Sequence, residues 1–324
     1  MTTRRVFLAS LATASVAMPF VSRAAWATSW PDKPIKIIVP YAAGGNTDGV
    51  ARLIGQHYTE TFGQQVVVEN RTGGGGSLAA EAVARAEPDG NTIFMATVSQ
   101  IAIFPAMNKV NYNAVTDFAP ISNLISNPFC LVTHKDFPAK TLPQLVEYVK
   151  SKPGQFVYAS GGVGSLGHLT MALFNKRAGL EMTHTPYRGG GPAMKDVLAG
   201  HVPVYFGNLS EALPHQGGLL NLLAVSGATR AKQLPNVPTV AEQGYPGFRT
   251  ETWNGFMAPA KTPKEIIDKL AAEAVRGLRD PKTLEKLASY GVDPIGSTPE
   301  EFAATIKADI ALWEDAVKVA GVKS

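Results

Sequence analysis

Four glycine-rich loops, each between a strand-like run and a helix-like run, constrain the fold of this chain more than any other feature. The loops are residues 41–48, 72–77, 161–168 and 187–192. A glycine-rich turn that leads into a helix exposes backbone N–H groups at the positive end of the helix dipole, which favours an anion. The loops are split between two halves of the chain, which predicts anion-binding surfaces that face each other across a cleft.

Strand-like and helix-like patterns alternate along almost the whole chain. Apolar runs predict strands at 35–39, 65–69, 92–97, 156–160, 182–186, 202–206, 219–225 and 251–258. Helical spacing predicts helices at 47–62, 77–85, 141–150 with Thr141 as the cap, 168–178, 192–199, 263–279, 281–290 and 298–319. The β-α-β-α-β order indicates the α/β class with a parallel, doubly wound sheet.

The alternation restarts after Pro128, which predicts two domains joined by a hinge. The three C-terminal helices are expected to pack back on the first sheet. Domain 1 is therefore placed at residues 28–127 plus 251–324, and domain 2 at residues 128–250. The chain crosses between them near Asn127 and Thr250.

Residues 1–27 have the order of a secretory signal: Arg4 and Arg5, an uncharged run from 6 to 21, and a small-residue end at Ala27, after which cleavage is expected. The apolar run is shorter than the roughly 20 residues that a membrane-spanning helix needs, so an integral membrane protein is not expected. Thr3–Leu8 also resembles a twin-arginine signal, and both export routes stay open.

The signal contains three arginines and no acidic residue, so 27 basic and 26 acidic residues remain after its removal. This balance gives no reason to expect nucleic acid or an anionic membrane as a partner.

Cys130 is the single cysteine, so no intramolecular disulfide can form. It lies in the apolar run 129–133, which is typical of a buried strand and favours a small core residue over a reactive thiol.

Two enzyme classes are weighed against simple binding. Residues 162–167 fit G-x-G-x-x-G, but Tyr187 and Arg188 stand where a dinucleotide site would have an acid, which favours a smaller anion. For a secreted hydrolase, Ser165 lacks the glycine of a nucleophile elbow, since Val163 stands there. Ser77 comes nearer to that pattern, but it is interpreted as a helix N-cap.

Three polar residues near the loops have two open interpretations each. His168 either lines the cleft or caps its own helix, and no histidine pair has metal-ligand spacing. The Asp48 carboxylate either only interacts favourably with the helix dipole or orients the 44–47 loop, and in the second case it acts on a ligand indirectly. Arg188 either clamps a carboxylate or is simply exposed.

The chain resembles the Bug family, the periplasmic solute receptors of tripartite tricarboxylate transporters. The resemblance covers essentially all of the chain after the signal and starts at Trp30-Pro31-Asp32-Lys33-Pro34. The further matching segments are Val39-Pro40-Tyr41 with Gly44-Gly45 and Asp48, Glu69-Asn70-Arg71, Gly76-Ser77, Pro88-Asp89-Gly90, Tyr158-Ala159-Ser160, Gly164-Ser165, His168-Leu169, Pro186-Tyr187-Arg188-Gly189, Ala212-Leu213-Pro214-His215, Leu234-Pro235-Asn236-Val237-Pro238-Thr239 and Ala258-Pro259-Ala260.

The resemblance implies a type II periplasmic binding protein, a two-domain Venus flytrap that closes on a small carboxylate and presents it to a permease. In relatives, backbone amides and bridging waters at the loop that matches residues 41–48 hold one carboxylate, and the loops that match 161–168 and 188–191 approach the rest of the ligand. Water bridges tolerate varied ligands.

Three departures from the family pattern bear on the ligand. Gly207 stands where many relatives have an acid, which argues against a paired ligand amino group there. Asn46 replaces a proline, and Leu166-Gly167 replaces a proline pair, at the mouth of the pocket.

These observations predict an exported, monomeric receptor for an aliphatic or aromatic carboxylate, with a transporter membrane subunit as partner and without enzymatic activity, cofactor or metal. A sensor subunit for a signalling system and a secreted hydrolase are the alternative functions. The predicted ligand-binding residues are Tyr41, Gly44, Gly45, Asn46, Thr47, Asp48, Gly76, Ser77, Ser99, Gly161, Gly162, Gly164, Ser165, His168, Arg188, Gly189, Gly190 and Asn208.

Overall fold

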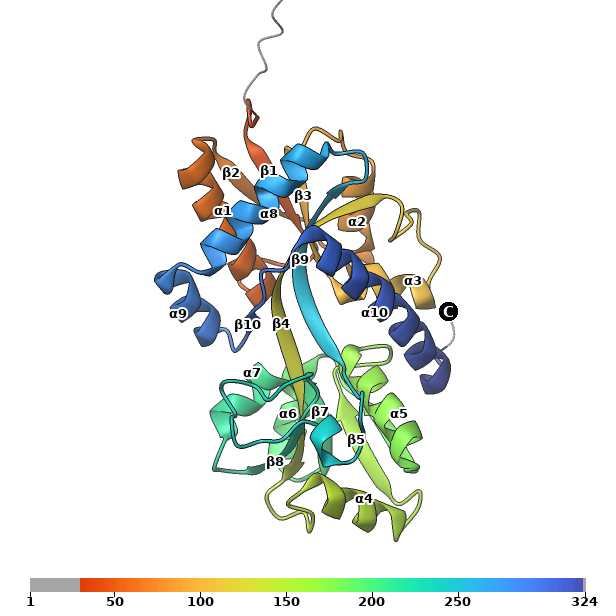
Figure 1. The fold of residues 1–324 in the computed structure, drawn as a ribbon. Helices are drawn as coiled ribbons and strands as arrows, with labels where there is room; N and C mark the ends of the chain where they lie inside the picture. Colours follow the sequence, from red (N-terminus) through yellow and green to blue (C-terminus); the bar gives the residue numbers. More distant parts are fainter. Residues whose placement is uncertain (1–29, 323–324) are drawn as a thin grey trace, which may run out of the picture.

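A 17-residue strand, β4 (Phe118–His134), connects the two lobes of the protein in the computed structural model (Figure 1), which describes residues 30–322. The predicted export signal at residues 1–27 lies outside the described residues. The first part of β4 pairs with β9 (Glu251–Pro259) as far as Pro128, and from Phe129 onward β4 pairs with the strands of the other lobe. One strand therefore belongs to both lobes.

Lobe 1, the upper part of Figure 1, contains both ends of the described chain. Its strands follow the order β2-β1-β3-β9-β4, in which β1 is parallel to β2 and β3, and β9 is antiparallel to β3 and β4. Its other elements are β1 (Ile35–Val39), α1 (Asn46–Phe62), β2 (Val66–Asn70), η1 (Gly74–Gly76), α2 (Ser77–Ala84), β3 (Thr92–Thr97), η2 (Ser99–Ile103), α3 (Phe104–Met107), α8 (Lys264–Leu278), α9 (Pro281–Ser289), β10 (Asp293–Pro294) and α10 (Pro299–Ala320).

Lobe 2, the lower part of Figure 1, continues the sheet in the order β4-β7-β5-β6, with β8 also paired to β4. The strand β5 is parallel to β6 and β7, whereas β7 and β8 are antiparallel to β4. Its elements are α4 (Leu142–Lys150), β5 (Phe156–Ser160), α5 (Leu166–Ala178), β6 (Met182–Pro186), α6 (Gly190–Leu198), β7 (Val204–Asn208), α7 (Leu209–Ala212), η3 (Leu213–His215), β8 (Leu220–Val225) and η4 (Ala241–Gln243).

Apolar clusters cover both faces of the sheet in each lobe. In lobe 1, α1 and α8 contribute to the core on one face, and α2, η2 and α10 to the core on the other. In lobe 2, α4 and α5 cover one face, and α6 and α7 cover the other. Strands buried on both faces read as continuous apolar runs, which explains why the alternation of elements was visible in the sequence.

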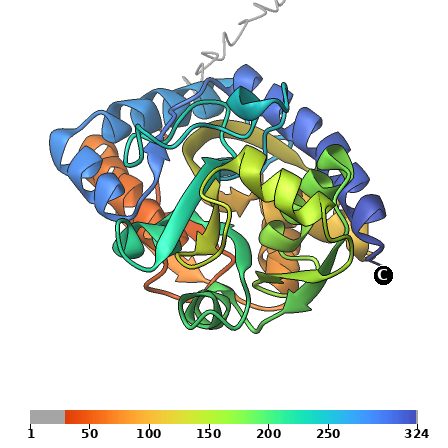
Figure 2. The same cartoon turned by 90° about the horizontal axis from the view of Figure 1, so that it is seen from below.

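The C-terminal helix α10 is shared between the lobes. It contacts η2, α3 and β4 in lobe 1 and α5 in lobe 2. In the view from below, the blue C-terminal helices lie along one side of the molecule and reach the green elements of lobe 2 (Figure 2). The predicted packing of the terminal helices on the first sheet is therefore only part of their role.

The α/β class is confirmed, but the sheet is mixed rather than parallel, because β9 and β4 enter it antiparallel. The predicted first residues of two helices and one strand differ by two from those in the structure. Helix α5 begins at Leu166 because Ser165 caps it, and α6 begins at Gly190 because Gly189 precedes it with a φ of +114°, which only glycine adopts easily. Strand β7 begins at Val204, after Pro203, which has no N–H for the ladder.

Candidate functional site

A cavity of about 420 Å³ lies between the lobes, and we call it the cleft cavity. It is lined by hydroxyl and amide side chains with a few apolar ones, and no residue of its lining within the described range 30–322 is charged. The lining residues are Tyr41, Asn46, Thr47, Thr97, Ser99, Asn127, Phe129, Leu166, Asn208, Ser210, Thr252, Asn254 and Tyr290. Both lobes and both crossing strands, β4 and β9, contribute to this wall.

The first turn of α1 faces the cleft cavity. Gly45 is the N-cap, and Asn46 and Thr47, the first residues of the helix, line the cavity. Gly44 has a φ of +94°, and a Cβ placed on Gly44 or Gly45 would meet no atom of residues 30–322 within 4 Å. The start of a 17-residue helix thus borders open space, an arrangement that favours an anion at its N–H groups.

Asp48 lies behind this loop rather than in the lining. The residue is only 4% exposed, and its Oδ2 accepts hydrogen bonds from the Gly44 N–H and from Arg52 Nε, both at 3.0 Å. Asn70 Nδ2 donates to its Oδ1 at 2.9 Å. Burial raises the pKa of Asp48, but the bonds from Arg52, Gly44 and Asn70 outweigh burial and lower the pKa overall. The carboxylate therefore stays charged and holds the loop.

Tyr41 is held at the cavity wall by a buried glutamine that the sequence analysis missed. Gln100 is fully buried, and its Nε2 donates to Tyr41 Oη and to the Gly75 carbonyl, both at 2.9 Å. Its Oε1 accepts from the Thr97 hydroxyl at 2.8 Å. Gln100 thus links two of the glycine loops. The available signal was a polar residue directly before the apolar run 101–104.

Gly76 and Ser77 do not line the cleft cavity. A Cβ on Gly76, whose φ is +91°, would lie 2.5 Å from Gln100 Nε2 and 2.8 Å from Pro40 Cβ. Close packing against Gln100 therefore explains why a glycine occupies position 76. The predicted N-cap role of Ser77 is wrong, because Gly76 occupies the cap position and Ser77 is the first residue of α2.

In lobe 2, the loop of residues 161–165 leads into α5, whose first residue, Leu166, lines the cleft cavity. Ser165 is the N-cap and accepts the His168 N–H at 3.3 Å. Gly164 has a φ of +74°, and a Cβ there would lie 2.7 Å from Met107 Sδ of lobe 1. The loop therefore contacts the opposite lobe directly.

His168 is buried on α5, and its Nδ1 accepts the Gly164 N–H at 3.1 Å. Of the two interpretations left open by the sequence, this contact corresponds to binding the start of its own helix. His168 lines a different cavity, described below, and not the cleft cavity.

The loop before α6 packs against the loop before α5. The Gly189 N–H donates to the Gly161 carbonyl at 3.1 Å, and a Cβ on Gly161 would lie 3.3 Å from the Gly190 nitrogen. The Glu211 carboxylate lies directly against Gly190, where a Cβ would collide with it. The protein's own carboxylate therefore occupies the space beside this helix start. Arg188 is exposed.

Of the predicted residues, Tyr41, Asn46, Thr47, Ser99 and Asn208 lie in the lining of the cleft cavity. The remaining predicted residues lie outside that lining, and their ligand contacts stay predictions. These are Gly44, Gly45, Asp48, Gly76, Ser77, Gly161, Gly162, Gly164, Ser165, His168, Arg188, Gly189 and Gly190.

Two asparagines on the crossing strands are part of the site and were not predicted. Asn254 on β9 donates from Nδ2 to Thr47 Oγ1 at 3.1 Å, which ties the strand to the start of α1. Asn127 on β4 is 2% exposed, and its Oδ1 has no hydrogen-bond partner among the described residues. A buried acceptor in a cavity wall is expected to find a ligand or water donor.

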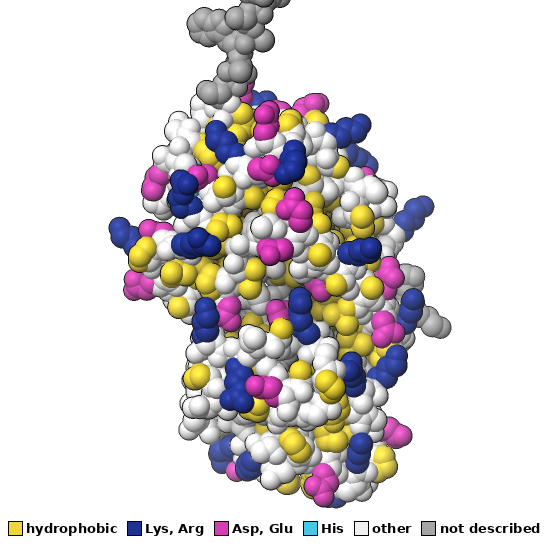
Figure 3. All heavy atoms as spheres, in the orientation of Figure 1, with side chains coloured by type: hydrophobic (Ala, Val, Ile, Leu, Met, Phe, Trp, Pro, Cys, Tyr) yellow, Lys and Arg dark blue, Asp and Glu magenta, His cyan; other side chains and the backbone are white. Residues whose placement is uncertain are grey.

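Surface charges of both signs are interspersed over the face in Figure 3, in agreement with the near balance of basic and acidic residues. Within residues 30–322, no group of three or more His, Cys, Asp or Glu side chains could hold a metal ion. Among the helices of the same range, none combines the length and the apolar character that crossing a membrane requires.

A family model described as the tripartite tricarboxylate transporter family receptor matches residues 50–322. BugT of Bordetella pertussis is 34% identical over 316 residues, which cover 97% of this chain and 95% of BugT. Several solved structures are also similar over nearly their full length. The R. palustris protein Rpa4515 with adipate is 34% identical, with a TM-score of 0.75 and coverage of 90% of this chain and 98% of Rpa4515. MatC from Rhodopseudomonas palustris with bound malate is 33% identical, with a TM-score of 0.71 and coverage of 89% of this chain and 100% of MatC.

Proposed function

Because the chain belongs to the family of tripartite tricarboxylate transporter receptors, we propose that it is a periplasmic receptor that binds a small organic carboxylate in the cleft cavity and delivers it to a membrane transporter. The observation that carries the proposal is the placement of the cleft cavity at the start of α1, between two lobes that both contribute lining residues. A ligand there contacts both lobes at once.

The chemistry of the cleft cavity suits a carboxylate without a cationic partner. Its lining offers hydroxyl and amide donors, and the first turn of α1 offers backbone N–H groups. Such neutral donors, helped by the helix dipole and by bridging waters, stabilise an anion without a buried counter-ion. Adipate and malate, bound by two relatives, are the first ligands to test.

The two crossings between the lobes are proposed as the hinge, near Asn127 on β4 and Thr250 before β9. Ligand bound to lobe 1 then engages the loops of lobe 2 as the lobes close. The domain division at residues 28–127 plus 251–324 and 128–250 follows these crossings.

A secreted hydrolase finds little support in the serines near the site. Ser160 and His184 form a Ser–His pair with Oγ and Nε2 2.6 Å apart, but Ser160 is fully buried. A nucleophile must reach its substrate, so this pair does not make an active site. A sensor role would use the same ligand site with a different partner protein.

The test is a thermal-shift and calorimetric screen of residues 28–324 against adipate, malate and other mono-, di- and tricarboxylates, after unfolding and refolding to remove co-purified ligand. A ligand at 100 times its Kd should add about 2.7 kcal/mol of stability. The free acid should be recovered unchanged. Absence of binding by every carboxylate would contradict the proposal.

A further inference from the structure

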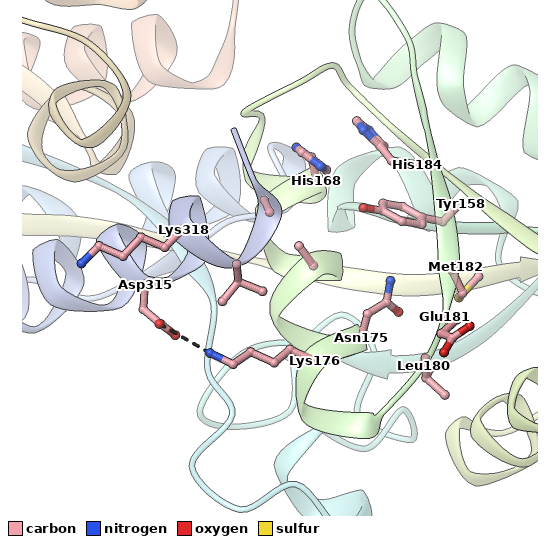
Figure 4. Close-up of a pocket in the computed structure, with 13 residues that line it drawn as sticks. Tyr158, His168, Asn175, Lys176, Leu180, Glu181, Met182, His184, Asp315 and Lys318 are labelled. Carbon is pink, nitrogen blue, oxygen red and sulfur yellow. Dashed lines mark ion pairs between the residues drawn. The ribbon is translucent and has the colours of Figure 1, made fainter. Parts of the chain in front are cut away.

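A second cavity, of about 680 Å³, lies between α5, β6 and α10, and we call it the α5–α10 cavity. Figure 4 shows His168, His184 and Tyr158 grouped on one side of it, away from the ion pair of Lys176 and Asp315. None of these groups belongs to the cleft cavity. The two histidines come from different elements, α5 and β6.

The imidazole rings of His168 and His184 are stacked face to face. Their centroids are 3.8 Å apart and their planes differ by 9°. The Tyr158 ring lies beside both imidazoles, with centroid distances of 5.1 Å to His184 and 6.4 Å to His168. His168 is 5% exposed and His184 is half-buried. Two rings at this separation are compatible with a neutral pair, whereas two charged rings would repel strongly.

Each imidazole also holds one end of the glycine loop of lobe 2. The Gly164 N–H donates to His168 Nδ1 at 3.1 Å, so that nitrogen must be unprotonated. His184 Nε2 lies 2.6 Å from Ser160 Oγ, which in turn accepts the Gly162 N–H at 3.1 Å. The conformation of residues 161–165 thus depends on the stacked pair.

The same loop borders the ligand site. Leu166, which follows it, lines the cleft cavity, and Gly164 packs against Met107 of lobe 1. A change in the loop would therefore alter both a wall of the cleft and a contact between the lobes.

We infer that His168 and His184 are positioning residues for this loop, and that protonation of the pair releases the loop and weakens ligand binding in acid. The inference rests on the proposed function for its ligand. A proton on His168 Nδ1 removes the acceptor of the Gly164 N–H. A second proton on His184 places two positive rings in contact.

The surroundings of the pair favour the neutral state at pH 7. Burial lowers the pKa of His168, and burial together with the neighbouring His168 lowers the pKa of His184 to about 4. The other titratable groups that face the cavity are Tyr158 on β5, Lys176 on α5, Glu181 before β6, and Asp315 and Lys318 on α10. The Lys176 Nζ and an Asp315 oxygen are 3.6 Å apart, so these two charges largely offset each other. Protonation is therefore expected only well below neutral pH.

The first experiment measures the Kd of adipate and malate by calorimetry between pH 7.5 and 3.5. The test variant combines His168→Asn and His184→Gln, because these amides keep a polar atom near Nδ1 and near Nε2 but cannot take a proton. The matched control is His201→Gln, a histidine of the same lobe whose side chain is 70% exposed.

Wild type and the His201→Gln control should lose about tenfold more affinity over this range than the double variant, as expected for the loss of about one hydrogen bond. Protonation of the ligand affects all three proteins equally. Equal losses in all three would overturn the inference.

The second experiment needs neither a ligand nor a variant. NMR follows the imidazole signals of His168 and His184 and the amide signal of Gly164 in wild type as the pH falls. The Gly164 amide should shift and exchange faster with the same midpoint as the imidazoles. An unchanged Gly164 amide while the imidazoles titrate would overturn the inference, whereas failure of every carboxylate to bind at pH 7.5 would contradict only the proposed function.

Discussion

At the scale of single residues, the site depends on buried polar side chains whose partners are internal. Asp48 uses its carboxylate on Gly44, Arg52 and Asn70, so it shapes the ligand loop without offering a charge to the ligand. Asn127, in contrast, lines the cleft with an Oδ1 that lacks a partner among residues 30–322. Asp48 therefore fixes the conformation of the ligand loop, and Asn127 is suited to contact a ligand directly.

Gln100→Ala is expected to lower the free energy of unfolding by about 1–3 kcal/mol, because it leaves buried donors and acceptors of Thr97 and Gly75 unpaired. Ligand affinity should fall as well, since Tyr41 loses the donor that holds its hydroxyl. Urea unfolding and calorimetry measure the two effects. Gln56→Ala is the matched control, because the Gln56 side chain bonds to Glu60 on the exposed surface of α1. A Gln100→Ala protein as stable as this control would contradict the role of Gln100.

At the scale of elements, the sequence predicted most helices and strands because their apolar patterns are strong and local. The first part of β4 was missed, since Pro120, Ser122, Asn123 and Ser126 interrupt the apolar run. The hydroxyl groups of Ser122 and Ser126 have hydrogen-bond partners in later segments of the chain. Ser122 Oγ, for example, donates to the Ser297 carbonyl at 2.7 Å. A single sequence does not reveal partners that lie 175 residues away.

In the candidate site, too, the sequence predicted local features but not contacts between distant segments. The start of α1 was predictable because a glycine loop and a helix are adjacent in sequence. Asn127 and Asn254 were not, because strand pairing between β4 and β9 brings them to the cleft. An anion site was also expected before α6, but the sequence did not indicate that Glu211, from the separate short helix α7, lies against Gly190.

The glycine loop before α1 allows a test that separates binding from folding. Gly45 has φ −80° and ψ 170°, which any residue adopts, and a Cβ there meets nothing within 4 Å. Gly45→Ala should therefore change the free energy of unfolding by less than about 0.5 kcal/mol. Carboxylate affinity should fall about tenfold or more, because the methyl group enters the space beside the helix start.

Gly76→Ala is the opposite case in the neighbouring loop. Its φ of +91° and the close approach of Gln100 should make this variant unstable by more than about 1 kcal/mol. Thermal unfolding and calorimetry on both variants check the pair of outcomes. Wild-type affinity in Gly45→Ala would exclude the α1 loop from ligand binding.

At the scale of the whole molecule, Ser226 joins the two crossings between the lobes. It is fully buried, its N–H donates to the Phe129 carbonyl, and its Oγ accepts the Phe129 N–H, both at 2.9 Å. The Thr250 N–H donates to the Ser226 carbonyl at 3.0 Å, and the Ser226 hydroxyl donates to the Thr250 carbonyl. Both strands of the proposed hinge are therefore held by one residue of lobe 2.

Ser226→Ala should loosen this junction, because the Phe129 N–H and the Thr250 carbonyl lose a buried partner, at a cost of about 1–3 kcal/mol. With the crossings less restrained, the ligand-free protein should have a larger radius of gyration by X-ray scattering, and the ligand should bind more weakly because closure must order more of the chain. Wild type should become more compact at saturating ligand. Ser151→Ala, at the exposed end of α4, is the control, since the Ser151 hydroxyl bonds to the Tyr148 carbonyl within its own helix end. If Ser226→Ala matches this control in stability, size and affinity, the lobes do not depend on Ser226, and a hinge at these two crossings loses its main physical basis.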